Sequence, residues 1–131
     1  MKYLLDTRVW LWMEAQPHKL GPTTLMLLRD ERNEFYLSAA GAWEIALKFR
    51  RGELTLPDRS EEYVPDRMLA NGVKGIAVEV SHALAVAVVD GDRRDPIDRL
   101  LLGQAIVEGM PIVTADPRLA MSGVTVIEAT A

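Results

Sequence analysis

The chain contains 131 residues, of which 49 % are hydrophobic and 26 % are charged, and it contains no cysteine. This length is typical of one domain, residues 1–131, and the composition excludes a disordered tail, a collagen-like fibre and a coiled coil. The lack of cysteine excludes a disulfide framework, a thiolate metal site and a cysteine nucleophile. The formal net charge of −4 argues on its face against a nucleic-acid binder, because such proteins usually carry a basic footprint.

No apolar run approaches the roughly 18 residues that a membrane span needs. Asp6 interrupts the apolar stretch at the start of the chain, where an export signal would continue. We therefore expect a cytoplasmic protein that makes no contact with a membrane.

Short apolar runs alternate with segments of helical periodicity in the first half of the chain. Thr7 is the candidate N-cap of the first helix, and Gly52 is the residue expected to end the third. In chain order, the pattern predicts a strand at 3–6, helices at 7–14 and 23–32, a strand at 35–38 and a helix at 39–51.

The second half continues the alternation. We expect Pro65 to interrupt its first helix early, Ser81 to cap the second, and Asp95 with Pro96 to begin the third. In chain order, the pattern predicts a helix at 61–71, a strand at 75–80, a helix at 81–89, a polar loop at 90–94, a helix at 95–108, a strand at 111–114, a turn or short helix from 116, and a strand at 124–127. This alternation predicts the α/β class with a mainly parallel sheet.

Four acidic residues follow the predicted strands or lie in the helices after them: Asp6, Glu44, Asp98 and Asp116. Ligand sites of parallel sheets lie outside the carboxyl ends of the strands, so we expect these side chains to share one edge. Carboxylates gathered there repel each other unless a cation neutralises them, and a cluster with oxygen ligands alone suits Mg²⁺ or Mn²⁺. The matching chemistry is metal-assisted hydrolysis of a phosphodiester.

Each acid also has a purely structural interpretation. Asp6 can end a strand through an Asx-turn, and Glu44 can be an exposed helical residue. Asp98 can stabilise a helix N-terminus, and Asp116 before Pro117 can be a simple N-cap. The spacing alone therefore supports a hypothesis and leaves these alternatives open.

Four segments resemble the PIN-domain ribonucleases and, within them, the VapC-type toxins of bacterial toxin–antitoxin pairs. They appear in the family's order and spacing along essentially the whole chain, and it is their combination that is specific. The segments are Leu4-Leu5-Asp6-Thr7, Ser38-Ala39-Ala40 with Trp43-Glu44-Ile45-Ala46, Arg94-Asp95-Pro96-Ile97-Asp98-Arg99-Leu100-Leu101, and Val113-Thr114-Ala115-Asp116-Pro117.

The resemblance implies a PIN-like three-layer sandwich, with helices on both faces of a five-stranded sheet. It implies an endoribonuclease toxin that depends on Mg²⁺ or Mn²⁺, with Asp6, Glu44, Asp98 and Asp116 in the catalytic and metal-binding positions. Asp6 and Asp98 would be the firmest ligands, and Thr7 and Thr114 would support them through hydrogen bonds. Two bound divalent cations would also bring the formal charge from −4 to about zero, which makes an acidic chain compatible with RNA.

The resemblance further implies an RNA substrate, a homodimer, and a VapB-like antitoxin that covers the acidic site. We expect a rim of basic side chains to contact RNA or the antitoxin: Arg8, Lys48, Arg51, Arg93, Arg94 and Arg99. The first helix carries Trp10, Trp12 and Met13, and the second carries Leu25 to Leu28. This apolar surface belongs either to the core or to a groove or dimer contact. His18 and His82 lack metal-ligand spacing, so we assign neither a role.

The sequence departs from the family pattern at four positions without removing a proposed ligand. Arg8 and Arg93 stand where close relatives often carry histidine, and Gly41 and Gly103 replace more usual residues. Each of these glycines is expected to weaken its helix by about 1 kcal/mol relative to alanine.

Two other functions remain open at this point. One is a PIN-fold regulator that binds RNA or a protein without cutting, and the other is a nuclease acting on DNA or structured flaps. A phosphoryl-transfer enzyme with Asp6 as nucleophile fits less well, because Asp6-Thr7-Arg8 lacks a second acid and the chain has no glycine-rich phosphate loop.

Overall fold

The computed structural model describes residues 1–88 and 95–131, and within them all strand pairs of the sheet are parallel. The strand order is β3-β2-β1-β4-β5. The strands are β1 (Lys2–Leu5), β2 (Glu34–Ser38), β3 (Lys74–Ile76), β4 (Ile112–Thr114) and β5 (Val126–Glu128). The α-helices are α1 (Thr7–Ala15), α2 (Pro22–Arg29), α3 (Ala39–Arg50), α4 (Ser60–Asn71), α5 (Val80–Ala85) and α6 (Pro96–Glu108), and the 3-10 turns are η1 (Pro17–Lys19), η2 (Val86–Val88) and η3 (Pro117–Ser122).

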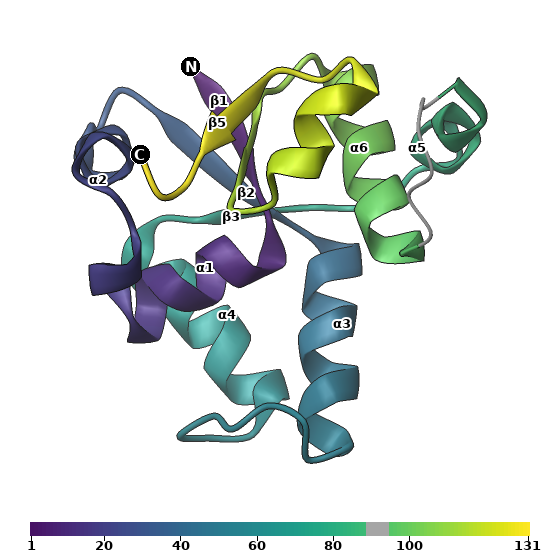
Figure 1. Ribbon diagram of the computed structural model, residues 1–131. Helices are drawn as coiled ribbons and strands as arrows, with labels where there is room; N and C mark the ends of the chain where they lie inside the picture. Colours follow the sequence, from purple (N-terminus) through teal and green to yellow (C-terminus); the bar gives the residue numbers. More distant parts are fainter. Residues whose placement is uncertain (89–94) are drawn as a thin grey trace.

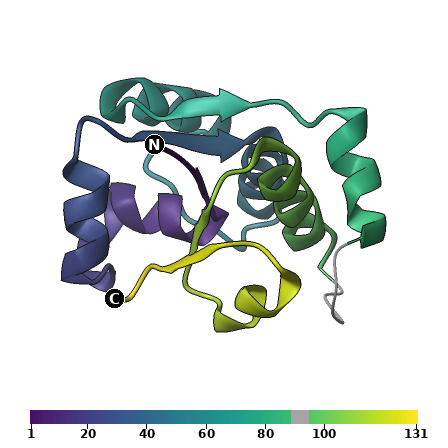
Figure 2. The ribbon, with the colours of Figure 1, turned by 90° about the horizontal axis from the view of Figure 1, so that it is seen from above.

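Helices cover both faces of this sheet, as Figures 1 and 2 show. Neighbouring residues of β1 point to opposite faces because side chains alternate along a strand. Tyr3 and Leu5 join the buried cluster that contains residues of α1 and α4, whereas Leu4 joins the cluster formed with α6 and η3. In the view from above, α1 and α2 lie on one side of the strands, and α5 and α6 lie on the other. The predicted PIN-like α/β sandwich is confirmed.

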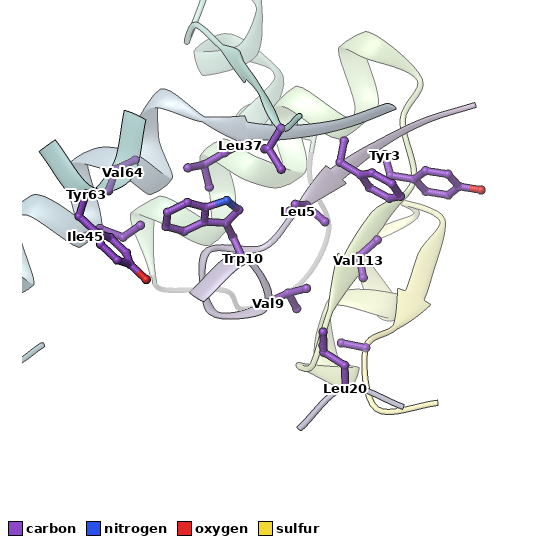
Figure 3. Packing of buried hydrophobic residues seen from close by; sticks show 13 residues of the cluster. Tyr3, Leu5, Val9, Trp10, Leu20, Leu37, Ile45, Tyr63, Val64 and Val113 are labelled. Atoms are coloured by element: carbon purple, nitrogen blue, oxygen red, sulfur yellow. The ribbon is translucent and has the colours of Figure 1, made fainter. Parts of the chain in front are cut away.

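Trp10 occupies the centre of the larger cluster (Figure 3). Its side chain is fully buried and meets the ring of Tyr63 edge to face at 6.3 Å, beside Leu37 and Ile45. The core interpretation of the first helix is therefore confirmed for Trp10. Trp12 and Met13 are half-buried at the margin of the same cluster.

Two predicted helix caps were wrong, although α1 begins at Thr7 as predicted. Asp6, not Thr7, occupies the N-cap position of α1, and its carboxylate makes no capping hydrogen bond. Glu79, not Ser81, caps α5 through a reciprocal capping box with His82. That histidine is buried and also lies 3.3 Å from the Glu108 carboxylate, so it joins α5 to α6. The sequence pattern missed this start because a histidine replaces the usual Glu or Gln of the box.

The predicted interruption at Pro65 was also wrong, because α4 continues through it from Ser60 to Asn71. Proline removes one backbone donor near the start of the helix. Tyr63 and Val64 are buried against the core, and this packing offsets the lost hydrogen bond. The end of the helix predicted at 81–89 and the loop predicted at 90–94 lie outside the described residues.

The strand order reverses at β1, which has β2 on one side and β4 on the other. Chain segments leaving the carboxyl ends of these strands diverge and open a crevice, the usual site location in such sheets. In the part of the chain that the structure describes, no helix is long and apolar enough to cross a membrane.

Candidate active site

A cavity of about 760 Å³ lies at the carboxyl ends of β1 and β4. All four predicted acids line it, although they come from four separate segments of the chain. Its lining residues are Asp6, Thr7, Arg8, Leu11, Glu44, Ile45, Lys48, Glu53, Leu54, Asp95, Asp98, Ala115, Asp116, Pro117 and Arg118.

The carboxylate of Asp6 is held by the end of β4. Thr114 Oγ1 donates a hydrogen bond of 2.7 Å to Asp6 Oδ2 and accepts one of 3.1 Å from the backbone N–H of Asp116. Thr114 is 1 % exposed, so its hydroxyl is fixed by packing as well as by these bonds. The position of Asp6 is therefore set by a neighbouring strand, and the Asx-turn alternative does not account for it.

The electrostatic surroundings of Asp6 disfavour its charged form. Burial raises the pKa of Asp6 most, and the nearby carboxylates of Asp98 and Glu44 raise it further. The hydrogen bond from Thr114 and the charge of Arg8 act in the opposite direction without cancelling the rise. A cation placed among these carboxylates would relieve the repulsion.

Glu44 and Asp116 each pair with a basic side chain. Lys48 Nζ lies 3.2 Å from Glu44 Oε2, one turn further along α3. Arg118 Nε and Nη2 each lie 3.1 Å from an oxygen of Asp116. Both carboxylates are mostly buried, with side-chain exposures of 18 % and 21 %, whereas Lys48 and Arg118 reach solvent.

Asp98 lies in the first turn of α6, next to the helix cap. Asp95 Oδ1 accepts hydrogen bonds from the backbone N–H groups of Ile97 (2.9 Å) and Asp98 (3.4 Å), so the predicted cap at Asp95-Pro96 is confirmed. Asp95 also lines the cavity, so this residue both caps α6 and contributes to the surface of the site.

Among the described residues, no three acidic or histidine side chains converge closely enough to form a ready metal cage. The donor set nevertheless fits a hard divalent cation. Mg²⁺ keeps several waters and is usually bound through one or two carboxylates together with substrate phosphates. Asp6 and Asp98 supply such a pair, and the repulsion that raises the pKa of Asp6 is what a cation would relieve.

Thr7, which was predicted to support the metal ligands, and part of the predicted basic rim lie at the cavity. Thr7 lines the cavity, and its buried Oγ1 has no hydrogen-bond partner within residues 1–88 and 95–131. Of the predicted basic rim, Arg8 and Lys48 line the cavity, whereas Arg51 and Arg99 do not. Arg93 and Arg94 lie outside the described residues.

Gly41 has a structural reason that the sequence did not reveal. A Cβ at this position would lie 2.8 Å from Thr7 Oγ1, closer than such atoms approach. Glycine therefore lets α3 pack against Thr7 at the start of α1. The close approach outweighs the cost in helix propensity.

Sequence reasoning missed three charged residues of the cavity: Glu53, Arg118 and Asp95, of which the last was expected only to begin a helix. Glu53 follows α3 in a connector without periodicity, so no pattern pointed to it. For Arg118 a signal was present, because the spacing Asp-x-Arg places a guanidinium within reach of the carboxylate that caps a turn. The same spacing occurs at Asp30 and Arg32.

The PIN domain family matches residues 3–123 of this chain. Ribonuclease VapC22 of Mycobacterium tuberculosis is 31 % identical over 119 residues, which cover 88 % of each chain. Ribonuclease VapC16 of the same organism is 46 % identical over 76 residues, and this match covers 53 % of the present chain and only about half (54 %) of that protein.

Solved structures share the fold at low sequence identity. The crystal structure of VapBC2 from Rickettsia felis, bound to a promoter DNA fragment, has a TM-score of 0.71 at 14 % identity, covering 98 % of both chains. The DNA-bound VapBC of Salmonella typhimurium has a TM-score of 0.71 at 15 % identity, also covering 98 % of both chains. At this identity they show the fold alone. The family match over residues 3–123 and the 31 % identity to Ribonuclease VapC22 show that this chain belongs to the PIN domain family and is of the VapC type.

Proposed function

We propose that this chain is an endoribonuclease that depends on Mg²⁺ or Mn²⁺ and acts as the toxin of a toxin–antitoxin pair. The observation that carries the proposal is the cavity in which Asp6, Glu44, Asp98 and Asp116 meet at the carboxyl edge of the sheet. The names of the relatives, which are ribonucleases, support the choice of RNA as substrate.

In this proposal Asp6 and Asp98 would hold the cation, and Thr114 fixes the Asp6 carboxylate through the 2.7 Å hydrogen bond. The bound ion would supply an activated water and stabilise the charge that develops on the phosphate. Glu44 and Asp116 would hold the ion directly or through water and would help to orient the attacking water. Arg8 and Lys48, which line the same cavity, contact the RNA backbone.

We also propose a VapB-like antitoxin as the partner that blocks this cavity. Solved structures of similar fold are VapBC complexes, which supports the proposal. Co-expression with the product of a short neighbouring reading frame is expected to abolish RNA cleavage. Cleavage that persists at equimolar amounts of a bound partner would contradict the proposal that the partner covers the site.

A homodimer is the third part of the proposal. Large apolar side chains are exposed at successive turns of α5 and η2, namely Val80, Leu84 and Val88, and such a stripe suits contact with a second chain. Light scattering of the purified chain is expected to give twice the mass of one chain. A monomer at all measured concentrations would contradict this part alone.

The function is tested by incubating the purified chain with labelled single-stranded RNA and, separately, with single-stranded DNA of the same sequence. We expect RNA cleavage with Mn²⁺, none with EDTA, and almost none for Asp98→Asn. Glu61→Gln, which removes an exposed carboxylate of α4 outside the cavity, is the matched control and should cleave normally. Because water is the nucleophile, the products should carry no 2′,3′-cyclic phosphate.

The alternatives give different results in the same assay. A regulator that binds without cutting leaves both substrates intact with Mn²⁺ present. A DNA nuclease cuts the DNA strand at least as fast as the RNA strand. Either result would contradict the proposed function.

A further inference from the structure

Arg118 is a basic residue of the cavity that does not belong to the predicted basic rim. It is the second residue of η3, directly after the Asp116-Pro117 step that follows β4. Its side chain lines the cavity and is 74 % exposed. It is thus a cation at the mouth of an acidic site, open to an incoming ligand.

The guanidinium of Arg118 is held in a defined orientation by Asp116. Its Nε and Nη2 donate to the two carboxylate oxygens, at 3.1 Å each, while its backbone N–H donates to Oδ1 at 3.0 Å. A guanidinium carries five N–H donors, and this pairing uses two of them. No other residue in the described ranges accepts a hydrogen bond from the remaining three.

A second Asp-x-Arg pair in the chain has the same geometry and no site around it. Arg32 donates from its backbone N–H, Nε and Nη2 to the Asp30 carboxylate at 3.0, 3.0 and 2.8 Å. This pair precedes β2 and therefore lies at the amino edge of the sheet, opposite to the cavity. An exposed pair of this kind contributes little to stability. Arg118 therefore differs from Arg32 in its location at the cavity and not in its local hydrogen bonds.

The net charge of the cavity is a reason to expect that a basic side chain such as Arg118 assists the approach of a phosphate. Within residues 1–88 and 95–131, six carboxylates line the cavity, against three basic side chains, Arg8, Lys48 and Arg118. One divalent cation would leave the balance negative, so each basic side chain matters for the approach of an RNA backbone. A planar guanidinium matches a phosphate in the same fork geometry as it matches a carboxylate.

We infer that Arg118 is an RNA-binding residue of this site, and that its exposed N–H donors contact a backbone phosphate while Asp116 holds the guanidinium in place. This inference rests on the proposed function, because it assumes that RNA enters the cavity. It makes Asp116 the positioning residue for Arg118, in addition to any contact that Asp116 makes with a cation.

The inference is tested by fluorescence anisotropy with a fluorescein-labelled single-stranded RNA, in EDTA and again with Ca²⁺, over a range of salt concentrations. We expect Arg118→Gln to weaken binding by roughly tenfold or more, because a charge-assisted phosphate contact is lost. In a plot of the logarithm of the RNA-binding constant against the logarithm of the salt concentration, the negative slope should become less steep by about 0.7. This is the value for one phosphate contact on a single strand. Arg118→Lys should give an intermediate affinity, because it keeps the charge and loses the fork.

Arg32→Gln is the matched control, since it breaks the equivalent pair at the opposite edge of the sheet. The Arg32→Gln variant should bind RNA as tightly as the unchanged protein does. Arg32→Gln and Arg118→Gln should both have the melting temperature of the unchanged protein. Unchanged affinity and salt slope in Arg118→Gln would overturn the inference, and so would an equal loss in Arg32→Gln. Failure of the proposed function would appear differently, as a lack of RNA binding and cleavage by the unchanged protein.

Discussion

Thr114 is the residue that links the end of one strand to the acid at the end of another. Its hydroxyl donates to Asp6 and accepts from the Asp116 backbone, so one atom organises two of the four proposed ligands. Such supporting hydrogen bonds usually affect metal affinity or activity by 10- to 100-fold. The position of Thr114 at the last residue of β4 makes this support part of the sheet itself.

Thr114→Val is expected to keep the shape of the side chain and remove both hydrogen bonds. The Asp116 N–H and the Asp6 carboxylate would then lose a partner, so RNA cleavage should fall about tenfold or more. Thr114→Ser retains the hydroxyl and should keep most of the activity. The measurement is the initial cleavage rate at saturating Mn²⁺, and equal rates for the valine and serine variants would contradict a supporting role.

At the scale of elements, the packing of α5 on α6 depends on Gly103. A Cβ at this position would lie 2.5 Å from the backbone oxygen of His82, and a backbone atom cannot move aside alone. Gln104 of the same helix donates to the Ala77 carbonyl at 3.2 Å, which further fixes the segment that leads into α5. The glycine that departs from the family pattern is therefore required by this contact.

Gly103→Ala is expected to destabilise the fold although alanine favours helices. The gain in helix propensity is about 1 kcal/mol, whereas forcing atoms into a filled contact typically costs about 1–3 kcal/mol. Gly75→Ala is a suitable control, because its Cβ would meet only the flexible end of Met68, at 3.7 Å. Urea unfolding measures the difference, and a Gly103→Ala variant more stable than the unchanged protein would contradict the role of this contact.

The regular pattern of elements could be predicted from the sequence because it depends on local periodicity and on strong caps such as Asp95-Pro96. The positions of the acids after β1, β2 and β4 also followed, because parallel strands carry their carboxyl ends to one edge. Contacts between distant segments could not be predicted in this way. The bond from Thr114 to Asp6, the approach of His82 to Gly103, and the packing that carries α4 through Pro65 all depend on tertiary structure.

At the scale of the whole molecule, the cavity concentrates negative charge, because its described carboxylates outnumber its basic side chains. Burial and the neighbouring carboxylates raise the pKa of Asp6, so its ionised form is disfavoured in the folded state. At a pH well below the usual pKa of an aspartate, the Asp6 carboxyl is protonated in both the folded and the unfolded chain and carries no penalty. As the pH rises through the folded-state pKa the penalty develops, and it lowers the free energy of unfolding of the metal-free protein.

Asp6→Asn is therefore expected to raise the melting temperature in EDTA at neutral pH, and this advantage should disappear toward pH 3. Millimolar Mn²⁺ should raise the melting temperature of the unchanged protein by several degrees, because it binds only the folded state. The same ion should have little effect on Asp6→Asn. Thermal unfolding followed by circular dichroism gives all three results, and a melting temperature unmoved by Mn²⁺ in the unchanged protein would count against a metal site.

Metal-dependent RNA cleavage at the acidic cavity is tested most directly by the rate at which Asp6→Asn cuts single-stranded RNA at saturating Mn²⁺. The asparagine keeps an acceptor for the Thr114 hydroxyl and removes only the charge, so the fold should be retained. We predict a loss of activity of at least a hundredfold relative to the unchanged protein, and we predict that EDTA abolishes the activity of the unchanged protein. Full cleavage by Asp6→Asn in Mn²⁺ would contradict the assignment of this site.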